Sequence, residues 1–151
     1  MIQLVAIQRD GTLTEECGPL TDPTRSVIEQ IVRLYESVGW NFPWVGYLAF
    51  EDDVCVGTCA FKGPPKINAV EIAYHTFREY EGRGIATQMA KQLCSIAKTA
   101  PLNVCVTAQT LPEENASTRV LRKLGFVLKG SMIDPEAGTV WEWSDEACVN
   151  A

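Results

Sequence analysis

The sequence lacks the segments that would carry a chain into or across a membrane. Its 151 residues contain no run of about eighteen apolar residues, and Met1–Val5 is not a basic segment followed by a long apolar one. We therefore expect a soluble, cytoplasmic protein without a membrane partner.

Ligands for metals and stable disulfides are also scarce. The chain has one histidine, and its six cysteines form none of the closely spaced pairs that zinc and redox sites use. Cys55 and Cys59 share one face of an expected strand, and Cys105 lies in an apolar run, so packing thiols are favoured over disulfides. The sequence predicts no metal site and a reducing compartment. The cysteines are Cys17, Cys55, Cys59, Cys94, Cys105 and Cys148.

The sequence has fewer basic than acidic residues. Thirteen Lys and Arg residues stand against nineteen Asp and Glu residues, which gives a formal net charge of −6. This charge argues against a nucleic-acid partner and mildly favours a cationic one. Hydrophobic residues make up 46% and charged residues 21% of the chain, with no internal repeat. The length suits a single domain over residues 1–151 with one core.

The most informative stretch covers residues 70–87, where a strand pattern passes through two glycines into a helix pattern. Apolar residues alternate in its first part, at Val70, Ile72 and Tyr74. After Gly84 they fall at helical spacing, at Ile85, Met89, Leu93 and Ile96. A helix that begins at Gly84 is therefore expected.

The start of this helix has the features of an anion site. The first backbone N–H groups of a helix have no partner within it, and the helix dipole places about half a positive charge there, so a phosphate is the natural ligand. Gly82 and Gly84 allow a ligand to approach the backbone closely. A Rossmann turn would need glycine at Thr87, and the Gly-Lys-Ser/Thr of a P-loop is absent. A helix-capping turn without a ligand is the remaining alternative.

Two segments together resemble the GNAT superfamily of N-acyltransferases. Residues 81–86, Glu-Gly-Arg-Gly-Ile-Ala, resemble its acetyl-CoA-binding motif Q/R-x-x-G-x-G/A, with Glu81 at the basic or amide position. Residues 115–126 resemble the segment N-x-x-S-x-x-V-L-x-K-x-G-F of the ribosomal-protein N-terminal acetyltransferase branch, with Asn115 one position closer to the serine. Two motifs in the right order indicate the family more strongly than either alone. The resemblance covers roughly residues 44–143.

The resemblance implies a mixed α/β fold, in which antiparallel strands are followed by a β-α-β unit, a helix and a C-terminal hairpin. Two central strands are expected to splay apart to admit the cofactor. The patterns agree, because Asp22 and Pro23 suit a helix N-cap and first helical position, Gly39 ends that helix, and Gly125 suits a left-handed cap. Strands are expected at residues 2–8, 44–51, 54–62, 70–76, 104–108, 127–133 and 139–143, and a loose tail after residue 145.

The resemblance also implies a set of cofactor-binding residues. Main-chain groups of His75, Thr76 and Phe77 would bind the pantetheine arm and the thioester carbonyl of acetyl-CoA. The pyrophosphate would lie on the amides of residues 82–87. Arg83 either adds charge there or is a solvated surface residue, and Asn115 either binds the arm or caps its helix. The residues at the pyrophosphate are Gly82, Arg83, Gly84, Ile85, Ala86 and Thr87.

Two residues are predicted to be catalytic. By the resemblance, Ser117 matches the serine that is proposed to protonate the leaving thiolate in the ribosomal-protein branch, and it also suits a helix cap. Leu121 stands where other family members have a tyrosine acid, which excludes that acid here. Glu71, on the central strand, is the expected base, with water relaying the proton. His75 lies roughly 13 Å further along the same face and is more often structural in such a place.

The sequence therefore predicts an acetyl-CoA-dependent N-acetyltransferase that acts on a primary amine of a small molecule or peptide, by direct attack in a ternary complex. A non-catalytic acyl-CoA-binding regulatory module on the same fold is the alternative. Either a monomer or a homodimer is expected. In the family the first helical region helps to form the acceptor site. The aromatic residues Trp40, Phe42 and Trp44 would therefore either line an acceptor pocket or fill the core.

Overall fold

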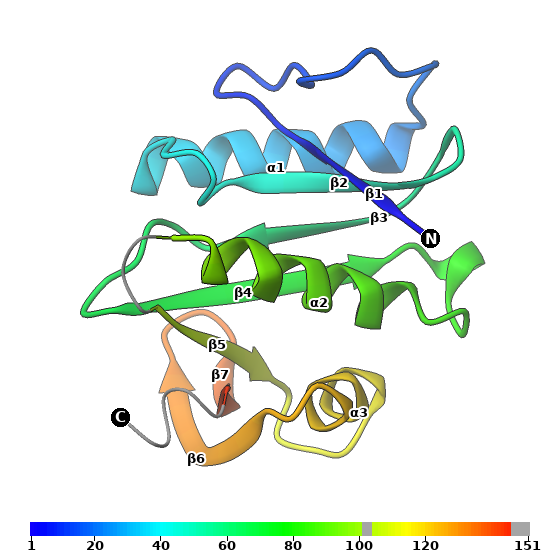
Figure 1. Ribbon diagram of the computed structural model, residues 1–151. Helices are drawn as coiled ribbons and strands as arrows, with labels where there is room; N and C mark the ends of the chain where they lie inside the picture. The colour runs from blue at the N-terminus through cyan, green and yellow to red at the C-terminus, as the bar shows by residue number, and fades with distance from the viewer. Residues whose placement is uncertain (101–103, 146–151) are drawn as a thin grey trace.

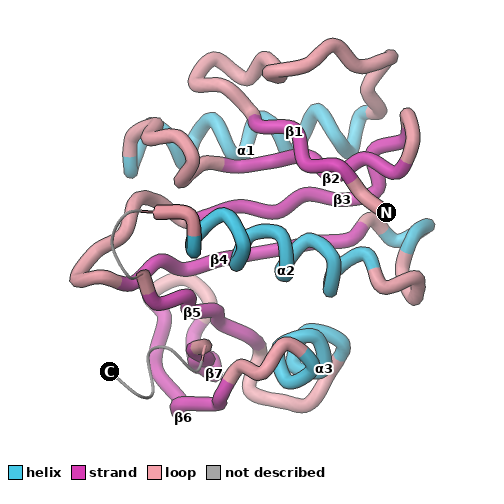
Figure 2. Tube along the Cα trace, viewed as in Figure 1, coloured by secondary structure: helices cyan, strands magenta, loops and turns pink. Residues whose placement is uncertain are grey.

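The protein is built around one mixed sheet of seven strands, seen in a computed structural model that describes residues 1–100 and 104–145 (Figures 1 and 2). The strand order is β1-β2-β3-β4-β5-β7-β6. Only β4 and β5 are parallel, and the other neighbours are antiparallel. The expected mixed α/β fold is confirmed. The strands are β1 (Gln3–Ala6), β2 (Gly46–Glu51), β3 (Val54–Phe61), β4 (Ala69–Thr76), β5 (Cys105–Thr110), β6 (Val127–Asp134) and β7 (Gly138–Ser144).

Helices cover both faces of the sheet, with α1 (Asp22–Val38) and α2 (Ile85–Lys98) on opposite sides (Figure 1). A Cβ atom added to Gly46 of β2 would lie 2.7 Å from Ile31 of α1. A Cβ atom added to Gly57 of β3 would lie 3.2 Å from Met89 of α2 and 2.6 Å from the His75 carbonyl oxygen. These contacts explain why glycine occupies both positions. A short 3-10 helix, η1 (Arg78–Tyr80), and α3 (Ala116–Lys123) complete the helices.

The core lies between the sheet and its helices. The strand β5 alternates half-buried and buried residues, as period-two patterning requires. Helix α2 contributes the expected stripe at period 3.6, and its buried residues include Met89 and Leu93. Trp40 and Trp44 pack against this core, and the Trp44 ring meets Phe61 edge-on at 5.0 Å. The core-filling alternative therefore holds for these two residues.

Helix α1 begins one residue earlier than the sequence pattern indicated. The N-cap is Thr21, whose hydroxyl accepts a hydrogen bond from the Thr24 N–H at 3.3 Å, whereas Asp22 is already helical. The prediction that Asp22 is the cap is wrong. Thr and Asp are both good N-caps, and which of them serves as the cap depends on where the backbone enters the helical conformation. The predicted end at Gly39 is confirmed, because Gly39 is the C-cap with φ of 85°.

A buried phenol connects the ends of the first two strands. The Tyr35 hydroxyl of α1 donates a hydrogen bond to the Ile7 carbonyl at 2.8 Å and accepts one from the Gly46 N–H at 2.8 Å. Tyr35 is 4% exposed. Burial raises its pKa to about 12, while the Gly46 N–H, which favours the phenolate, acts in the opposite direction. The phenol satisfies two backbone groups that β1 and β2 leave unpaired at this point.

One prediction about the cysteines is wrong. Cys105 is disulfide-bonded, whereas Cys17, Cys55, Cys59 and Cys94 are free thiols. Cys105 lies on the half-buried face of β5 rather than among its buried residues, so it is not the small core residue that the apolar run suggested. Cys148 and the predicted tail lie outside the described residues.

Candidate functional site

The site is centred on the glycine turn that leads from η1 into α2. Gly84 is the N-cap of α2 and has φ of 78°, in the left-handed region that favours glycine. No side chain among residues 1–100 and 104–145 forms a capping hydrogen bond at this helix end. A Cβ atom added to Gly82 or Gly84 would meet nothing within 4 Å. The first amides of α2 are therefore accessible to a ligand, which is the condition for anion binding at a helix N-terminus.

A fork between the two parallel strands lies next to this turn. The pairing of β4 with β5 runs from Ala69 and Cys105 to Ile72 and Ala108, where it stops. The strand β4 continues for four more residues to Thr76 without pairing with β5. The expected separation of the central strands is confirmed. It leaves one edge of residues 73–76 available for hydrogen bonding to something other than β5.

A pocket of about 520 Å³ joins the fork to the glycine turn, and we refer to it as the fork pocket. Its walls come from the end of β4, from residues 80–87 and from α3 along its whole length. The Thr76 hydroxyl oxygen in this lining is buried and has no hydrogen-bond partner among the described residues. The lining residues are Tyr74, His75, Thr76, Tyr80, Glu81, Gly82, Gly84, Ile85, Ala86, Thr87, Ala116, Ser117, Arg119, Val120 and Lys123.

Most of the residues predicted to bind the cofactor lie in this lining. They are His75, Thr76, Gly82, Gly84, Ile85, Ala86 and Thr87, together with the predicted catalytic Ser117. Three others lie elsewhere. Phe77 faces a different pocket, Arg83 forms an ion pair with Glu51 at the end of β2, and Asn115 is not part of the lining. The Arg83 guanidinium thus contacts the carboxylate of Glu51 instead of extending freely into solvent.

The first turn of α3 separates the roles of Asn115 and Ser117. Asn115 is the N-cap, because its side chain accepts a hydrogen bond from the Thr118 N–H at 3.0 Å and the Thr118 hydroxyl accepts one from the Asn115 N–H at 2.9 Å. This capping box leaves Ser117 out of the cap. The Ser117 hydroxyl belongs to a half-buried residue that faces the fork pocket, which leaves it available to a ligand.

Glu71 lies just before the fork, opposite Thr107 in the last paired part of β4. Its Oε2 atom forms an ion pair with the Lys62 ammonium at 2.7 Å, and its side chain is 26% exposed. Alternation along β4 points Glu71 and Tyr74 toward opposite faces of the sheet. Glu71 is absent from the fork-pocket lining, so the structure does not bring it into the same pocket as Ser117.

Sequence reasoning missed four polar residues of the lining, which are Tyr74, Tyr80, Arg119 and Lys123. The Tyr74 hydroxyl donates a hydrogen bond to the Ser117 carbonyl at 3.2 Å, and burial raises the pKa of this phenol. Arg119 and Lys123 are exposed and four residues apart on α3. The sequence did contain a signal for Arg119 and Lys123, because residues four apart share one face of a helix and the buried residues of α3 are Thr118 and Leu121.

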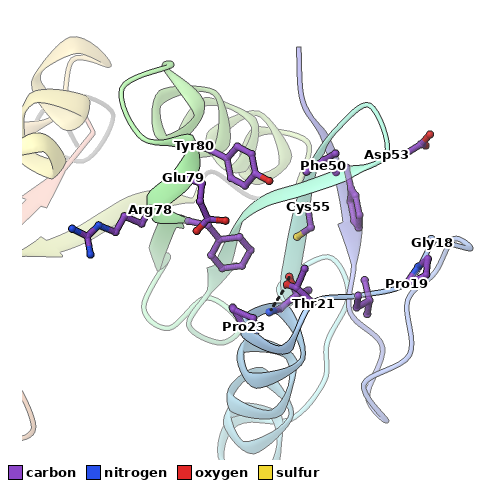
Figure 3. A pocket seen from close by; sticks show the side chains of 14 residues that line it. Gly18, Pro19, Thr21, Pro23, Phe50, Asp53, Cys55, Arg78, Glu79 and Tyr80 are labelled. Atoms are coloured by element: carbon purple, nitrogen blue, oxygen red, sulfur yellow. Dashed lines mark hydrogen bonds between the residues drawn. The ribbon is translucent and has the colours of Figure 1, made fainter.

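A second pocket of about 640 Å³ lies between η1, the β2–β3 hairpin and the start of α1 (Figure 3), and we refer to it as the hairpin pocket. In Figure 3 the side chains of Glu79 and Tyr80 face the hairpin, whereas Arg78 extends away from it. Tyr80 lines both pockets. The hairpin pocket is lined by Gly18, Pro19, Leu20, Thr21, Pro23, Thr24, Phe50, Asp53, Val54, Cys55, Phe77, Arg78, Glu79 and Tyr80.

Neither a metal cluster nor a membrane helix is found in the part of the chain that the structure describes. No three His, Cys, Asp or Glu side chains of residues 1–100 and 104–145 are grouped to hold a metal ion. Within the same residues, no helix is long and apolar enough to cross a membrane. The polar groups of the fork pocket are hydroxyls, cationic side chains, amides, the His75 imidazole and the Glu81 carboxylate. The amides and the cations suit an anionic organic ligand.

Comparison with known families gives a match over most of the chain. Residues 4–127 match the model of the acetyltransferase (GNAT) domain. No curated protein matches the sequence significantly.

Solved structures share the fold at low sequence identity. The Salmonella typhimurium acetyltransferase that modifies the N-terminal serine of ribosomal protein L7/L12 is 20% identical, with a TM-score of 0.63 over 83% of this chain and 74% of that one. The yncA protein of the same organism, solved with acetyl-CoA, is 16% identical, with a TM-score of 0.57 over 86% and 75%. A chimera of the spermidine N-acetyltransferase SpeG, from Vibrio cholerae and hSSAT, is 16% identical, with a TM-score of 0.67 over 95% and 94%.

Proposed function

The chain belongs to the GNAT family of acetyltransferases, and on this basis we propose that it transfers an acetyl group from acetyl-CoA to a primary amine of a small molecule or peptide. The observation that carries the proposal is the N-terminus of α2. It has no side-chain cap and faces a pocket that continues into the fork between β4 and β5. Coenzyme A has two parts that need to be held. The turn would bind its anionic pyrophosphate, and the fork would bind its extended pantetheine arm.

The amides of residues 82–87 would hold the pyrophosphate, because they combine unpaired N–H groups with the positive end of the helix dipole. The unpaired edge of residues 73–76 would bind the amide-containing arm through main-chain hydrogen bonds. The buried hydroxyl of Thr76, which has no partner among the described residues, is in a position to complete that set. These contacts involve the backbone, so they tolerate Glu81 at the basic position of the motif.

In the reaction the amine nitrogen attacks the thioester carbonyl carbon, the new C–N bond forms, and the C–S bond breaks. The amine loses one proton and the departing thiolate gains one. Ser117 is the proposed donor to the thiolate, because it lines the fork pocket and the helix cap is provided by Asn115. Holding both reactants in one complex supplies the orientation that direct attack needs.

Glu71 is the proposed acceptor of the amine proton, through a relaying water. It precedes Ile72, the last residue of β4 that pairs with β5, so it lies beside the fork but outside the fork pocket. The Lys62 ammonium forms an ion pair with this carboxylate at 2.7 Å. A water is needed because the carboxylate is not part of the pocket that holds Ser117.

The hairpin pocket is the proposed entrance for the acceptor. It meets the fork pocket at Tyr80, and its lining combines aromatic and aliphatic side chains with the carboxylates of Asp53 and Glu79. Apolar walls and carboxylates suit an amine that arrives as a cation on an apolar body. The neighbouring folds act on a protein N-terminus in one case and on spermidine in another, and both are primary amines in this sense.

The competing function is a regulatory module that binds acyl-CoA without turnover. The test is thiol release from acetyl-CoA in the presence of an amine panel that contains peptides with a free N-terminus, lysine, spermidine and an aminoglycoside. An acetyltransferase releases coenzyme A only with an acceptor, and the acetylated amine appears by mass spectrometry in equal amount. Ser117→Ala serves as the low-activity control. Tight acetyl-CoA binding with no product from any amine would favour the module instead.

A further inference from the structure

Lys62 comes directly after β3 and lies opposite Glu71 of β4. The register of these strands pairs Phe61 with Ile72. Lys62 and Glu71 form the next pair, and the Lys62 N–H donates a hydrogen bond to the Glu71 carbonyl at 2.9 Å. Directly opposed residues project to the same face of a sheet, and the Lys62 ammonium lies 2.7 Å from the Glu71 Oε2 atom. A primary amine of the chain itself thus contacts the residue that is proposed as the base.

The other lysines have no such contact. The chain contains six lysines, and all of them are exposed. Among residues 1–100 and 104–145, Lys62 is the only lysine that forms an ion pair within 4 Å. Lys123 lines the fork pocket, but it has no such carboxylate partner among these residues. Lys62 therefore combines an accessible amine with an adjacent proton acceptor.

The contact between Lys62 and Glu71 is not a rigid one. The Lys62 side chain is 45% exposed, whereas that of Glu71 is 26% exposed. The Oε2 atom is buried and makes no aligned hydrogen bond among the described residues, so charge attraction alone holds the ammonium there. The lysine side chain has a flexible four-carbon stem. The amine can therefore move away from Glu71 without a change in the backbone.

The pair lies at the closed end of the fork. The strands β4 and β5 separate beyond Ile72, which is the residue after Glu71. Glu71 and Tyr74 point toward opposite faces of β4, and the Tyr74 hydroxyl bonds to the Ser117 carbonyl. A thioester in the fork would therefore have Ser117 on one side and Lys62 with Glu71 on the other. An amine could attack from one side while the departing thiolate is protonated from the other.

We propose that Lys62 is an internal acceptor, so that the protein acetylates its own Lys62 side chain. The proposal rests on the proposed function, because acetyl-CoA supplies the acetyl group. The Lys62 ammonium gives one proton to the Glu71 carboxylate, which passes it to water, and the nitrogen attacks the thioester carbonyl carbon. The C–N bond forms, the C–S bond breaks, the thiolate takes a proton from Ser117, and the second nitrogen proton restores the Ser117 hydroxyl. The products are acetylated Lys62, coenzyme A and one proton.

The modification would change the surroundings of Glu71. Acetylation removes the charge of a lysine, so the ion pair between Lys62 and Glu71 is lost. Transfer to Lys62 occurs once in each chain, whereas an added amine supports repeated turnover. After that single event, added amines no longer compete with Lys62 for the base.

The test is incubation of the protein with acetyl-CoA in the absence of any added amine, followed by intact mass measurement and peptide mapping. We expect one acetyl group per chain, on Lys62. Lys62→Arg keeps the positive charge and should abolish the modification. Glu71→Gln should slow it about a hundredfold, a typical loss for a general base. The rate constant should be independent of protein concentration, because both reactants are held in one complex.

Lys66→Arg is the matched control, since Lys66 is an exposed lysine of the connection between β3 and β4. It should leave the acetylation of Lys62 unchanged. The inference fails if Lys62 stays unmodified, if Lys66 or Lys123 is acetylated as fast, if Glu71→Gln retains the wild-type rate, or if the rate constant rises with protein concentration. Acetylation of the amine panel would then still support the proposed function. If neither Lys62 nor any amine of the panel is acetylated, the proposed function fails as well.

Discussion

The Tyr74 hydroxyl donates a hydrogen bond to the Ser117 carbonyl at 3.2 Å, and this bond connects the central strand to the first turn of α3. The two residues are 43 positions apart in the chain and lie on either side of the fork pocket. The phenol therefore fixes how far α3 stands from β4, and with it the width of the pocket at Ser117. Tyr74→Phe removes only this hydroxyl.

We expect Tyr74→Phe to lower the free energy of unfolding by about 1 kcal/mol, the usual contribution of one neutral hydrogen bond. Coenzyme A affinity should fall with it, because α3 is less firmly held against β4. Denaturant unfolding and calorimetric binding measure the two effects. Thr58→Val, which removes a hydroxyl bonded to the Tyr47 carbonyl at 3.0 Å away from the fork pocket, is the control for stability without loss of affinity.

Gly84→Glu should strongly reduce coenzyme A binding, because it places a carboxylate where the pyrophosphate is proposed to lie. The matched control is Gly84→Gln, which has the same shape and the same strain at φ of 78° but no charge. Any residue with a Cβ atom costs about 1 kcal/mol or more in this conformation. Equal melting temperatures with different affinities would assign the loss to charge. Unchanged affinity for coenzyme A in both folded variants would show that the turn serves only as a helix cap.

Ser117→Ala and Asn115→Ala should have opposite consequences, although the residues are two positions apart. Asn115→Ala removes the cap of α3 and should lower the free energy of unfolding by about 1 kcal/mol. Ser117→Ala leaves the cap in place and should lower turnover without a comparable loss of stability. Turnover with an identified acceptor and thermal melting separate the two. A Ser117→Ala protein with wild-type turnover would remove the serine from the mechanism.

Glu71→Gln should lower turnover about a hundredfold if Glu71 acts as the base, with the largest loss at the acidic end of the pH range. Lys62→Met breaks the same ion pair but retains the carboxylate. If the pair matters only for stability, both variants lose stability alike and keep turnover. If Glu71 is the base, Lys62→Met retains much more activity than Glu71→Gln. The pH–rate profiles of both variants distinguish these results.

Tyr35 should make the fold sensitive to alkali. Its pKa rises from an unfolded value near 10.0 to about 12 in the folded protein, so folding favours the protonated phenol. The stabilisation is complete below pH 10 and is lost as the pH rises toward 12, by up to about 1.4 kcal/mol per pH unit. Tyr35→Phe should be less stable at pH 7 and should show a flatter decline above pH 10. Denaturant titrations at pH 7, 10 and 11 measure the difference.

Much of the fold was predictable because its signals are local. Gly125 has φ of 88°, and the Gly125 and Phe126 N–H groups donate to the Arg122 and Leu121 carbonyls, which is the Schellman ending of α3. The glycine start of α2 and the two-residue turn between β2 and β3 were predicted in the same way. Each depends on backbone conformations that few residue types adopt.

The remaining features depend on contacts between distant segments. The disulfide of Cys105 depends on where a second sulfur lies in space, which an apolar run does not reveal. The same holds for Arg119 and Lys123, because the rotation of α3 about its axis decides whether its basic stripe faces solvent or the fork pocket. The burial of Thr118 and Leu121 sets that rotation. The ion pair between Glu71 and Lys62 could likewise be predicted only with the register of β3 and β4 in hand.

The end of β4 beyond Ile72 is an interior sheet edge on which β5 no longer pairs, and none of the seven described strands completes it. A ligand with amide groups along an extended arm is in effect a missing strand, and its addition there would be β-augmentation by a small molecule rather than by a peptide. The ligand would then be recognised through main-chain groups rather than through side chains. The amides of Tyr74 and Thr76, which point away from β3, should accordingly exchange hydrogen quickly in the free protein and slowly once the ligand is bound.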